Sequence, residues 1–209
     1  MKAIFIVLFL LITMENSIEN DKMLIIFFSL TGNTETFANY IQKNANITSF
    51  RIVPVTPYPD NFTILSDIAH QEINSSARPE IKDPLTNISQ YNTILLGYPI
   101  WYSHIPNIVI TQLEKLNFKG KTIYPFNTHG SSGVGSSISD IKEYAPEAKV
   151  MDGYPIKGSE IRNKEEDVKD WLDDIFDLDS NETFIPRISN NDFKITFKNS
   201  LIIFLLFLF

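Results

Sequence analysis

The sequence predicts an α/β fold with a parallel β-sheet, and two observations support this prediction. First, short apolar runs typical of strands alternate with helical patterns from residue 23 to about residue 178. Strands that alternate with helices form right-handed βαβ units, in which helices cover both faces of a parallel sheet. Second, the chain has 209 residues, 44% hydrophobic and 21% charged, which is enough for one α/β domain of ordinary globular composition.

Five strands are predicted, because five short segments are rich in apolar and β-branched residues. In chain order they cover residues 24–28, 48–53, 93–98, 122–126 and 149–154. Prolines in the loop at 55–60 end the second strand, and Pro79 and Pro84 lie in the loop before the third strand.

Helical patterns fill the intervals between the strands. The first helix follows a polar loop after residue 28, and the second covers 61–74 with Leu65, Ile68 and Ala69 on one face. The third begins at Pro106 and ends near Leu116, and a short fourth helix follows the Gly/Ser-rich loop at 127–137. The fifth has the clearest apolar stripe, formed by Val168, Trp171, Leu172, Ile175 and Phe176. We expect its acidic face to be solvated, with partner docking as the alternative.

A polar loop lies between the first strand and the first helix. Its sequence is "SLTGNT", residues 29–34. Hydroxyls, together with the unpartnered N–H groups of a first helical turn, can hold an anion. The loop has neither the lysine of a triphosphate loop nor the three spaced glycines of a dinucleotide site, so a monophosphate ester fits it best. An ordinary capped turn is the alternative.

Two further loops are unusual, and both follow strands of the predicted sheet. Ligands of such sheets bind beyond the carboxyl ends of the strands. The loop after the third strand, "GYPIWYSHIPN" at 97–107, places Trp101 and Tyr102 in a turn between prolines. The loop after the fourth strand, "NTHGSSGVGSS" at 127–137, is rich in backbone amides and hydroxyls.

Composition and charge exclude several classes of function. The net charge of −7 argues against a nucleic-acid partner, because phosphate backbones attract basic surfaces. The absence of cysteine excludes disulfides, thiolate catalysis and cysteine-ligated metals. The three histidines, His70, His104 and His129, lie far apart without metal-ligand spacing. The sequence therefore predicts neither a metal site nor a catalytic side chain.

Together, the three loops resemble those of the flavodoxin-like family, in its branch with a Thr-His-Gly loop after the fourth strand. The matching segments are "SLTGNT", "GYPIWY" with a following proline, and the stretch from "PFNTHGSSGVGSS" to "DGYPIKG", within residues 23–178. The resemblance implies a three-layer sandwich in which helices cover both faces of a five-stranded parallel sheet of order 2-1-3-4-5. It also implies flavin mononucleotide (FMN) as the cofactor.

The resemblance assigns a role to residues in each loop. The residues that would hold the phosphate are Ser29, Thr31, Gly32, Asn33 and Thr34. The residues that would flank the isoalloxazine ring are Pro99, Ile100, Trp101 and Tyr102, and those that would meet its polar edge are Thr128, His129, Gly130 and Ser131. The indole of Trp101 offers a flat face for stacking, with a role as a loop anchor as the alternative. For His129 a hydrogen-bonding or structural role is favoured over proton donation, and Gly133 and Gly135 could simply permit the turn.

Two classes of function remain open. In the first, the protein is an electron carrier whose acidic surface meets a basic redox partner. In the second, it is an NAD(P)H-dependent FMN reductase acting on quinones or nitro compounds, which would need room for a nicotinamide beside the ring. A redox-silent binding role is a third and more distant alternative.

Both ends of the chain resemble processing segments. Residues 1–20 contain Lys2 and the apolar run 3–13, as in a signal peptide, with an uncleaved hydrophobic anchor as the alternative. The FMN-binding domain is predicted at 21–179. Residues 180–209 form a linker and an apolar tail whose layout matches a GPI-anchor attachment signal. These segments predict the secretory pathway or the cell surface, with membrane attachment through a terminal segment; a cytoplasmic location is the alternative.

Overall fold

The computed structural model describes residues 23–180, with side chains to residue 175. The predicted signal segment and the apolar tail lie outside the described residues. Among the helices that are described, none combines the length and the apolar character needed to cross a membrane. The chain divides into two compact units, Met1–Val168 and Lys169–Phe209, and the sheet described below belongs to the first unit.

The sheet is parallel, and its strand order confirms the predicted 2-1-3-4-5 arrangement. Its strands are β1 (Met23–Phe27), β2 (Thr48–Arg51), β3 (Thr93–Pro99), β4 (Thr122–His129), β5 (Lys149–Val150) and β6 (Tyr154–Lys157). The central strands β1 and β3 are almost wholly buried, as expected for a sheet covered on both faces.

The predicted fifth strand at 149–154 is interrupted, which corrects the sequence analysis. Both β5 and β6 pair with β4, β5 beside Thr122 and Ile123 and β6 beside the end of the strand. The chain leaves the sheet at Asp152 and Gly153, where a Cβ on Gly153 would lie 3.0 Å from the Ile138 side chain. Pairing with β6 extends β4 as far as His129, three residues beyond the predicted end.

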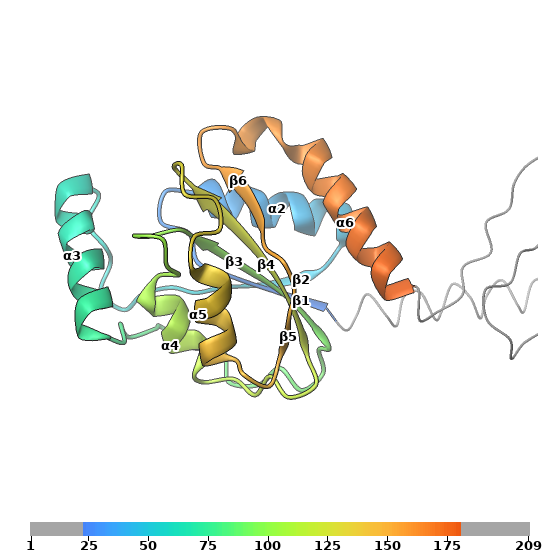
Figure 1. The fold of residues 1–209 in the computed structure, drawn as a ribbon, viewed down its shortest axis with the longest axis horizontal. Helices are drawn as coiled ribbons and strands as arrows, with labels where there is room; N and C mark the ends of the chain where they lie inside the picture. Colours follow the sequence, from blue (N-terminus) through green and yellow to red (C-terminus); the bar gives the residue numbers. More distant parts are fainter. Residues whose placement is uncertain (1–22, 181–209) are drawn as a thin grey trace, which may run out of the picture. The chain divides into compact units, whose positions relative to one another are not determined.

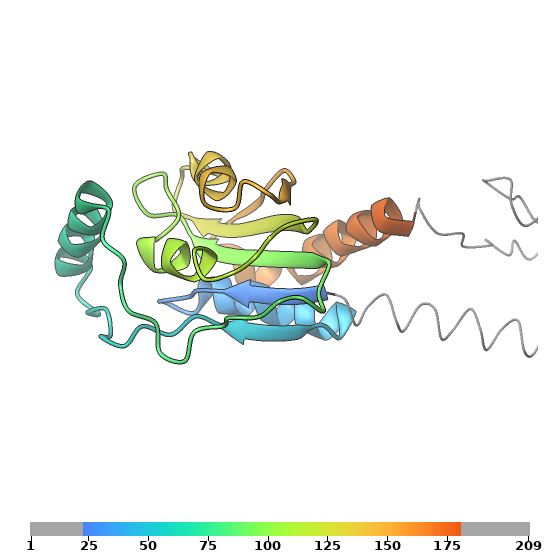
Figure 2. The same ribbon diagram turned by 90° about the horizontal axis from the view of Figure 1, so that it is seen from below.

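The helices are α2 (Asn33–Ala45), α3 (Phe62–Ser75), α4 (Asn107–Leu113), α5 (Ser137–Tyr144) and α6 (Glu165–Ser180), with a short 3₁₀ turn at Ile161–Asn163. α4 and α5 cover one face of the sheet and α2 covers the other, which confirms the three-layer sandwich (Figures 1 and 2). In α6, Val168, Leu172 and Ile175 of the predicted stripe are buried. Three elements end earlier than predicted: β1 at Phe27, β2 at Arg51 and α4 at Leu113.

Helix α3 stands apart from the sheet in both views (Figures 1 and 2). The predicted apolar face is only partly correct, because Ala69 alone is buried while Leu65 and Ile68 are half-buried. At the other end of the helix Phe62 is 80% exposed and Ile64 is 53% exposed. Burial in the core therefore contributes little to the position of α3.

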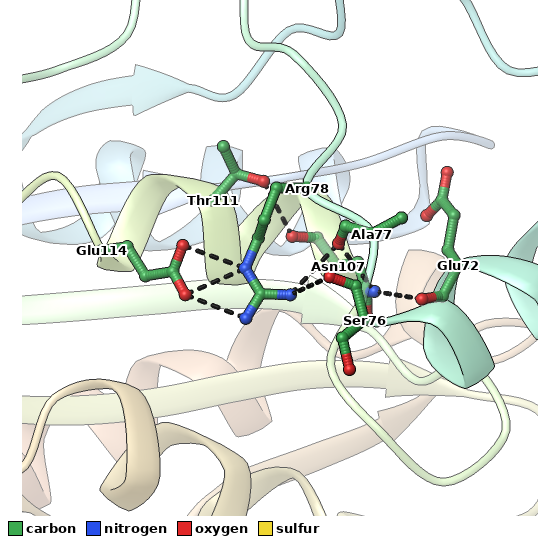
Figure 3. A network of polar contacts seen from close by, with 7 residues as sticks. All are labelled: Glu72, Ser76, Ala77, Arg78, Asn107, Thr111 and Glu114. Atoms are coloured by element: carbon green, nitrogen blue, oxygen red, sulfur yellow. Dashed lines mark hydrogen bonds and ion pairs between the residues drawn. The ribbon is translucent and has the colours of Figure 1, made fainter.

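Polar contacts hold the C-terminal end of α3 instead (Figure 3). The buried Asn107 side chain, from the first turn of α4, donates to the backbone oxygens of Glu72 at 2.6 Å and Ala77 at 2.9 Å. Arg78 donates to the Ala77 oxygen and binds both carboxylate oxygens of Glu114, the residue that follows α4. These side-chain bonds add to the backbone bond from the Ala77 N–H to the Glu72 oxygen at 2.9 Å, and they attach the end of α3 to the start of α4.

Candidate functional site

The sheet brings the three predicted loops to one edge. In the parallel register Phe27 lies beside Gly97, Gly97 beside Phe126, and Pro99 beside Thr128, so the carboxyl ends of β1, β3 and β4 are adjacent. Gly97 is required here, because a Cβ would come within 2.3 Å of the Phe126 ring. The loops that follow these strands therefore start side by side.

The loop at 29–34 leads into α2 through a left-handed residue. Gly32 has φ of +87°, and no side chain caps the helix there. Ser29 is 95% buried, yet its hydroxyl has no hydrogen-bond partner. Within the helix, the first-turn N–H groups have no carbonyl partners. An orphaned hydroxyl beside an uncapped helix N-terminus fits a phosphate better than it fits the ordinary capped turn.

Two of the predicted site residues bind each other. The hydroxyls of Thr34 and Thr128 are 2.8 Å apart, and both side chains are buried. This bond joins the first turn of α2 to the end of β4, so both hydroxyls have a structural partner. Asn33, the neighbour of Thr34, packs against Gly158, where a Cβ would lie 2.7 Å from the Asn33 amide nitrogen.

A cation that the sequence analysis missed lies beside the polar loop. Arg51, the last residue of β2, donates to the backbone oxygen of Ser29 at 3.3 Å and pairs with Glu35 at 2.6 Å. It is paired with Phe27 in the sheet register, and only that pairing reveals its proximity to the loop. An open cavity of about 350 Å³ borders Arg51, Ser29 and Tyr58.

The loop after β3 folds into a tight turn. Trp101 and His104 exchange two backbone hydrogen bonds, of 3.0 and 2.8 Å. Tyr102 and Ser103 between them have φ of +48° and +70°, the pattern of a type I′ turn, which usually requires glycine or asparagine. Such strain persists only where surrounding contacts enforce it, and it is concentrated at functional sites.

Contacts from three directions enforce this turn. The backbone oxygen of Ser103 accepts a bond from the N–H of Ser136 at 2.6 Å, and a Cβ on Gly135 would collide with that oxygen. The ring of His104 bonds to Asp140 on α5 at 3.0 Å. Tyr102 points to α3, where its hydroxyl bonds to Ser66 Oγ at 2.6 Å.

The indole of Trp101 is half-buried in an aromatic cluster. Its ring lies edge-on to those of Tyr58, at 5.1 Å and 85°, and Phe28, at 5.7 Å and 88°. Neighbouring Pro99 and Ile100 are half-buried, and the Ile100 N–H donates to the Thr128 oxygen. Tyr58 belongs to the loop between β2 and α3 and was not predicted as a site residue.

The Thr-His-Gly segment lies partly in the sheet. Gly130 and Ser131 are exposed, whereas His129 is half-buried at the end of β4. Its Nδ1 atom is buried without a partner, and burial together with the nearby Lys157 charge lowers the pKa of the imidazole. His129 borders a cavity of about 270 Å³ near β6. Within residues 23–175, no cluster of side chains is suited to hold a metal ion.

Comparisons with known proteins agree with this geometry. Residues 22–175 match a flavodoxin family model. A candidate flavoprotein from Bacteroides eggerthii is 31% identical, with 74% of this chain and 98% of that chain covered and a TM-score of 0.65. One from Bacteroides uniformis is 28% identical over 73% and 97% of the two chains, with a TM-score of 0.64.

A flavoprotein from Lactobacillus acidophilus NCFM, solved in complex with FMN, is 23% identical to this chain. The alignment covers 68% of this chain and 97% of that chain, with a TM-score of 0.56, and it shows a shared fold. Among curated proteins, none matches the chain.

Proposed function

We propose an FMN-dependent redox function from one premise: the chain belongs to the flavodoxin family. In this proposal FMN is the only redox centre, and the protein carries electrons between partners. Bound FMN would supply one- and two-electron transfer, and the protein would supply binding, orientation and control of water. The solved relative from Lactobacillus acidophilus carries FMN, which supports the choice of cofactor.

One observation carries the proposal: the Ser29 hydroxyl, buried and without a partner, lies next to the uncapped N-terminus of α2. Ser29, Thr31, Gly32 and Asn33 would hold a phosphate through hydroxyl and N–H groups, favoured by the helix dipole. Thr34 would contribute its N–H, because its hydroxyl already binds Thr128.

The remaining predicted residues would surround the ring. Trp101 would stack on it, and Pro99 and Ile100 would flank it at the end of β3. Tyr102 would flank the ring on the side nearest α3, because its hydroxyl is hydrogen-bonded to Ser66 of that helix. The residues that would meet the polar edge through amide and hydroxyl groups are Thr128, His129, Gly130 and Ser131.

The first test compares two ligands that differ only in the phosphate. We expect the purified protein to bind FMN at least 100-fold more tightly than riboflavin, because only FMN can use the loop at 29–34. Ser29→Ala should lower this ratio, because a hydrogen bond to a charged group contributes about 1.5–3 kcal/mol. Ser89→Ala, an exposed serine far along the chain, is the control. Equal affinities for FMN and riboflavin would rule out the phosphate site.

A steady-state assay separates the carrier from the reductase. The carrier proposal predicts no sustained oxidation of NADH or NADPH with a quinone or nitro compound as acceptor. Chemically reduced protein should instead pass electrons to an added acceptor in a single turnover. Sustained turnover with either nicotinamide would favour the NAD(P)H-dependent FMN reductase.

The acidic chain favours a basic redox partner. Cytochrome c, a basic haem protein, can serve as the probe. The chain carries a net charge of −7, so it attracts a basic protein. The rate of electron transfer from the reduced protein to cytochrome c should therefore fall as ionic strength rises, because salt screens this attraction. A rate that does not depend on salt would contradict electrostatic steering.

A further inference from the structure

We propose that Tyr58 and Glu72 are positioning residues that fix the plane of the Trp101 indole at the flavin site. The inference rests on the proposed function, because it assumes that Trp101 faces the flavin. Neither residue belongs to the three loops that carry the family resemblance. Tyr58 lies between β2 and α3, and Glu72 lies in the last turn of α3.

Tyr58 is placed to orient the indole. Its ring is the nearest to Trp101 in the aromatic cluster, with centroids 5.1 Å apart and planes at 85°. Phe28 contacts both rings and closes the cluster. Edge-to-face pairs favour one relative orientation because the positive edge of one ring meets the negative face of the other. A rotation of Tyr58 would therefore change the orientation that suits Trp101.

Glu72 fixes Tyr58 in turn. The Tyr58 hydroxyl donates to Oε2 of Glu72 at 3.1 Å, and the Glu72 backbone oxygen accepts the bond from Asn107. Figure 3 shows Glu72 beside Asn107 and the carbonyls that end α3. The carboxylate is thus attached to α4 through its own backbone, so the chain of contacts runs from α4 through Glu72 and Tyr58 to Trp101.

Holding the Glu72 carboxylate and the Tyr58 hydroxyl inside the protein removes them from water, which costs free energy. Burial raises the pKa of the Glu72 carboxyl above its ordinary value, because the charged form loses solvation. Burial also raises the pKa of Tyr58, which therefore remains a neutral donor at physiological pH. Among the described residues, the Glu72 side chain binds Tyr58 alone. A partly buried carboxylate with one such partner adds little to the core, so a role in orientation accounts for it better.

The same helix also holds the neighbour of Trp101. Ser66 of α3 binds the Tyr102 hydroxyl, and the His70 ring lies 5.2 Å from the Tyr102 ring. Consecutive residues of the strained turn are thus attached to α3, Trp101 through Tyr58 and Tyr102 directly. Because Ala69 is the one residue of α3 that is buried, these polar and aromatic contacts are what α3 contributes to the turn.

The experiment uses the full chain carrying Trp171→Phe, so that Trp101 is the only indole. In this background we compare Tyr58→Phe, Glu72→Ala and Glu72→Gln, with Tyr91→Phe, another half-buried tyrosine, as the matched control. Three quantities are measured: the near-ultraviolet circular dichroism of Trp101 without flavin, the Kd for FMN, and the midpoint of urea unfolding.

We expect Tyr58→Phe and Glu72→Ala to weaken the Trp101 dichroism and to raise the Kd for FMN about threefold to tenfold. Glu72→Gln keeps an acceptor for the Tyr58 hydroxyl and should restore both values, and Tyr91→Phe should change neither. Unchanged dichroism in Tyr58→Phe and Glu72→Ala would overturn the proposal. So would a lower unfolding midpoint without a change in the indole signal, because that is the signature of a purely structural role.

The two proposals can fail separately. If neither the parent nor any variant binds FMN, the proposed function fails. The dichroism measured without flavin still decides whether Tyr58 and Glu72 orient Trp101. If FMN binds the parent and all variants equally, the proposed function stands and the positioning role is excluded.

Discussion

The helices that follow β1 and β2 are held in place by different forces. α2 buries five of its residues, Thr34, Phe37, Ala38, Ile41 and Ala45, on the sheet. α3 is of similar length but buries only Ala69. Its position depends on hydrogen bonds at its C-terminal end and on the contact with Tyr102.

This difference suggests that the two helices contribute to the proposed flavin site in different ways. The apolar face of α2 makes its N-terminus a rigid part of the core, which suits a fixed anion site. α3 contributes little apolar burial, so its polar contacts can determine the geometry of the Trp101–Tyr102 turn without determining whether the domain folds. Substitutions on the apolar face of α2 should therefore affect mainly stability, and substitutions in α3 mainly the Trp101–Tyr102 turn.

The largest expected effect tests this contrast directly. Phe37→Ala removes a fully buried ring that packs 4.7 Å from Phe126, and it should lower the free energy of unfolding by about 3–5 kcal/mol. Phe62→Ala makes the same change at the 80% exposed position on α3 and should cost less than about 0.5 kcal/mol. Urea unfolding of both variants measures the difference; comparable losses would mean that α3 is part of the core.

A smaller effect is expected at the end of α3. Asn107→Leu keeps the side-chain volume but removes the two hydrogen bonds to the backbone oxygens of Glu72 and Ala77. Both oxygens keep another donor, so the loss should cost about 1–3 kcal/mol, at about 0.5–1.5 kcal/mol for each bond. Hydrogen exchange should rise in α3 more than in α2. The control is Asn44→Leu on α2, whose exposed side chain binds only the Tyr40 oxygen. Equal exchange in the two helices would show that Asn107 does not hold α3.

The sequence predicted the strands of the sheet because they depend on local signals, whereas their order was implied by the family resemblance and is confirmed by the strand pairing. Buried strands such as β1 and β3 are continuous apolar runs, and the polar loop at 29–34 interrupts that pattern clearly. The split between β5 and β6 was missed, because Asp152 and Gly153 lie in a stretch whose composition still resembles a strand. Only the pairing of β6 with β4 shows the interruption.

The parts of the site that sequence reasoning missed come from other regions of the chain. Arg51 and Tyr58 reach the loops through sheet register and the course of the β2–α3 loop, and neither leaves a periodic signal. The exposure of α3 was also missed, because Leu65, Ile68 and Ala69 have helical spacing whether or not a core lies beneath them. The FMN site itself remains a prediction. It consists of thirteen residues: Ser29, Thr31, Gly32, Asn33, Thr34, Pro99, Ile100, Trp101, Tyr102, Thr128, His129, Gly130 and Ser131.

The smallest expected effect concerns the pH dependence of α3. Burial raises the pKa of Glu72 in the folded state, so between the unfolded value of about 4.3 and the folded value the native protein binds more protons than the unfolded chain. The stability contributed by protonated Glu72 is therefore complete below that range and is lost as pH rises through the folded pKa. Glutamine does not titrate and keeps an acceptor for the Tyr58 hydroxyl.

Glu72→Gln should therefore be slightly more stable than the parent at pH 7, and this advantage should shrink as the pH falls to about 4. Glu72→Ala should show the same pH-dependent slope relative to the parent, displaced to lower stability because the Tyr58 hydroxyl loses its acceptor. Urea unfolding of the three proteins across this pH range measures both the slope and the offset. A difference between Glu72→Gln and the parent that does not change with pH would mean that Glu72 does not lose solvation on folding, and α3 would then be held without electrostatic cost.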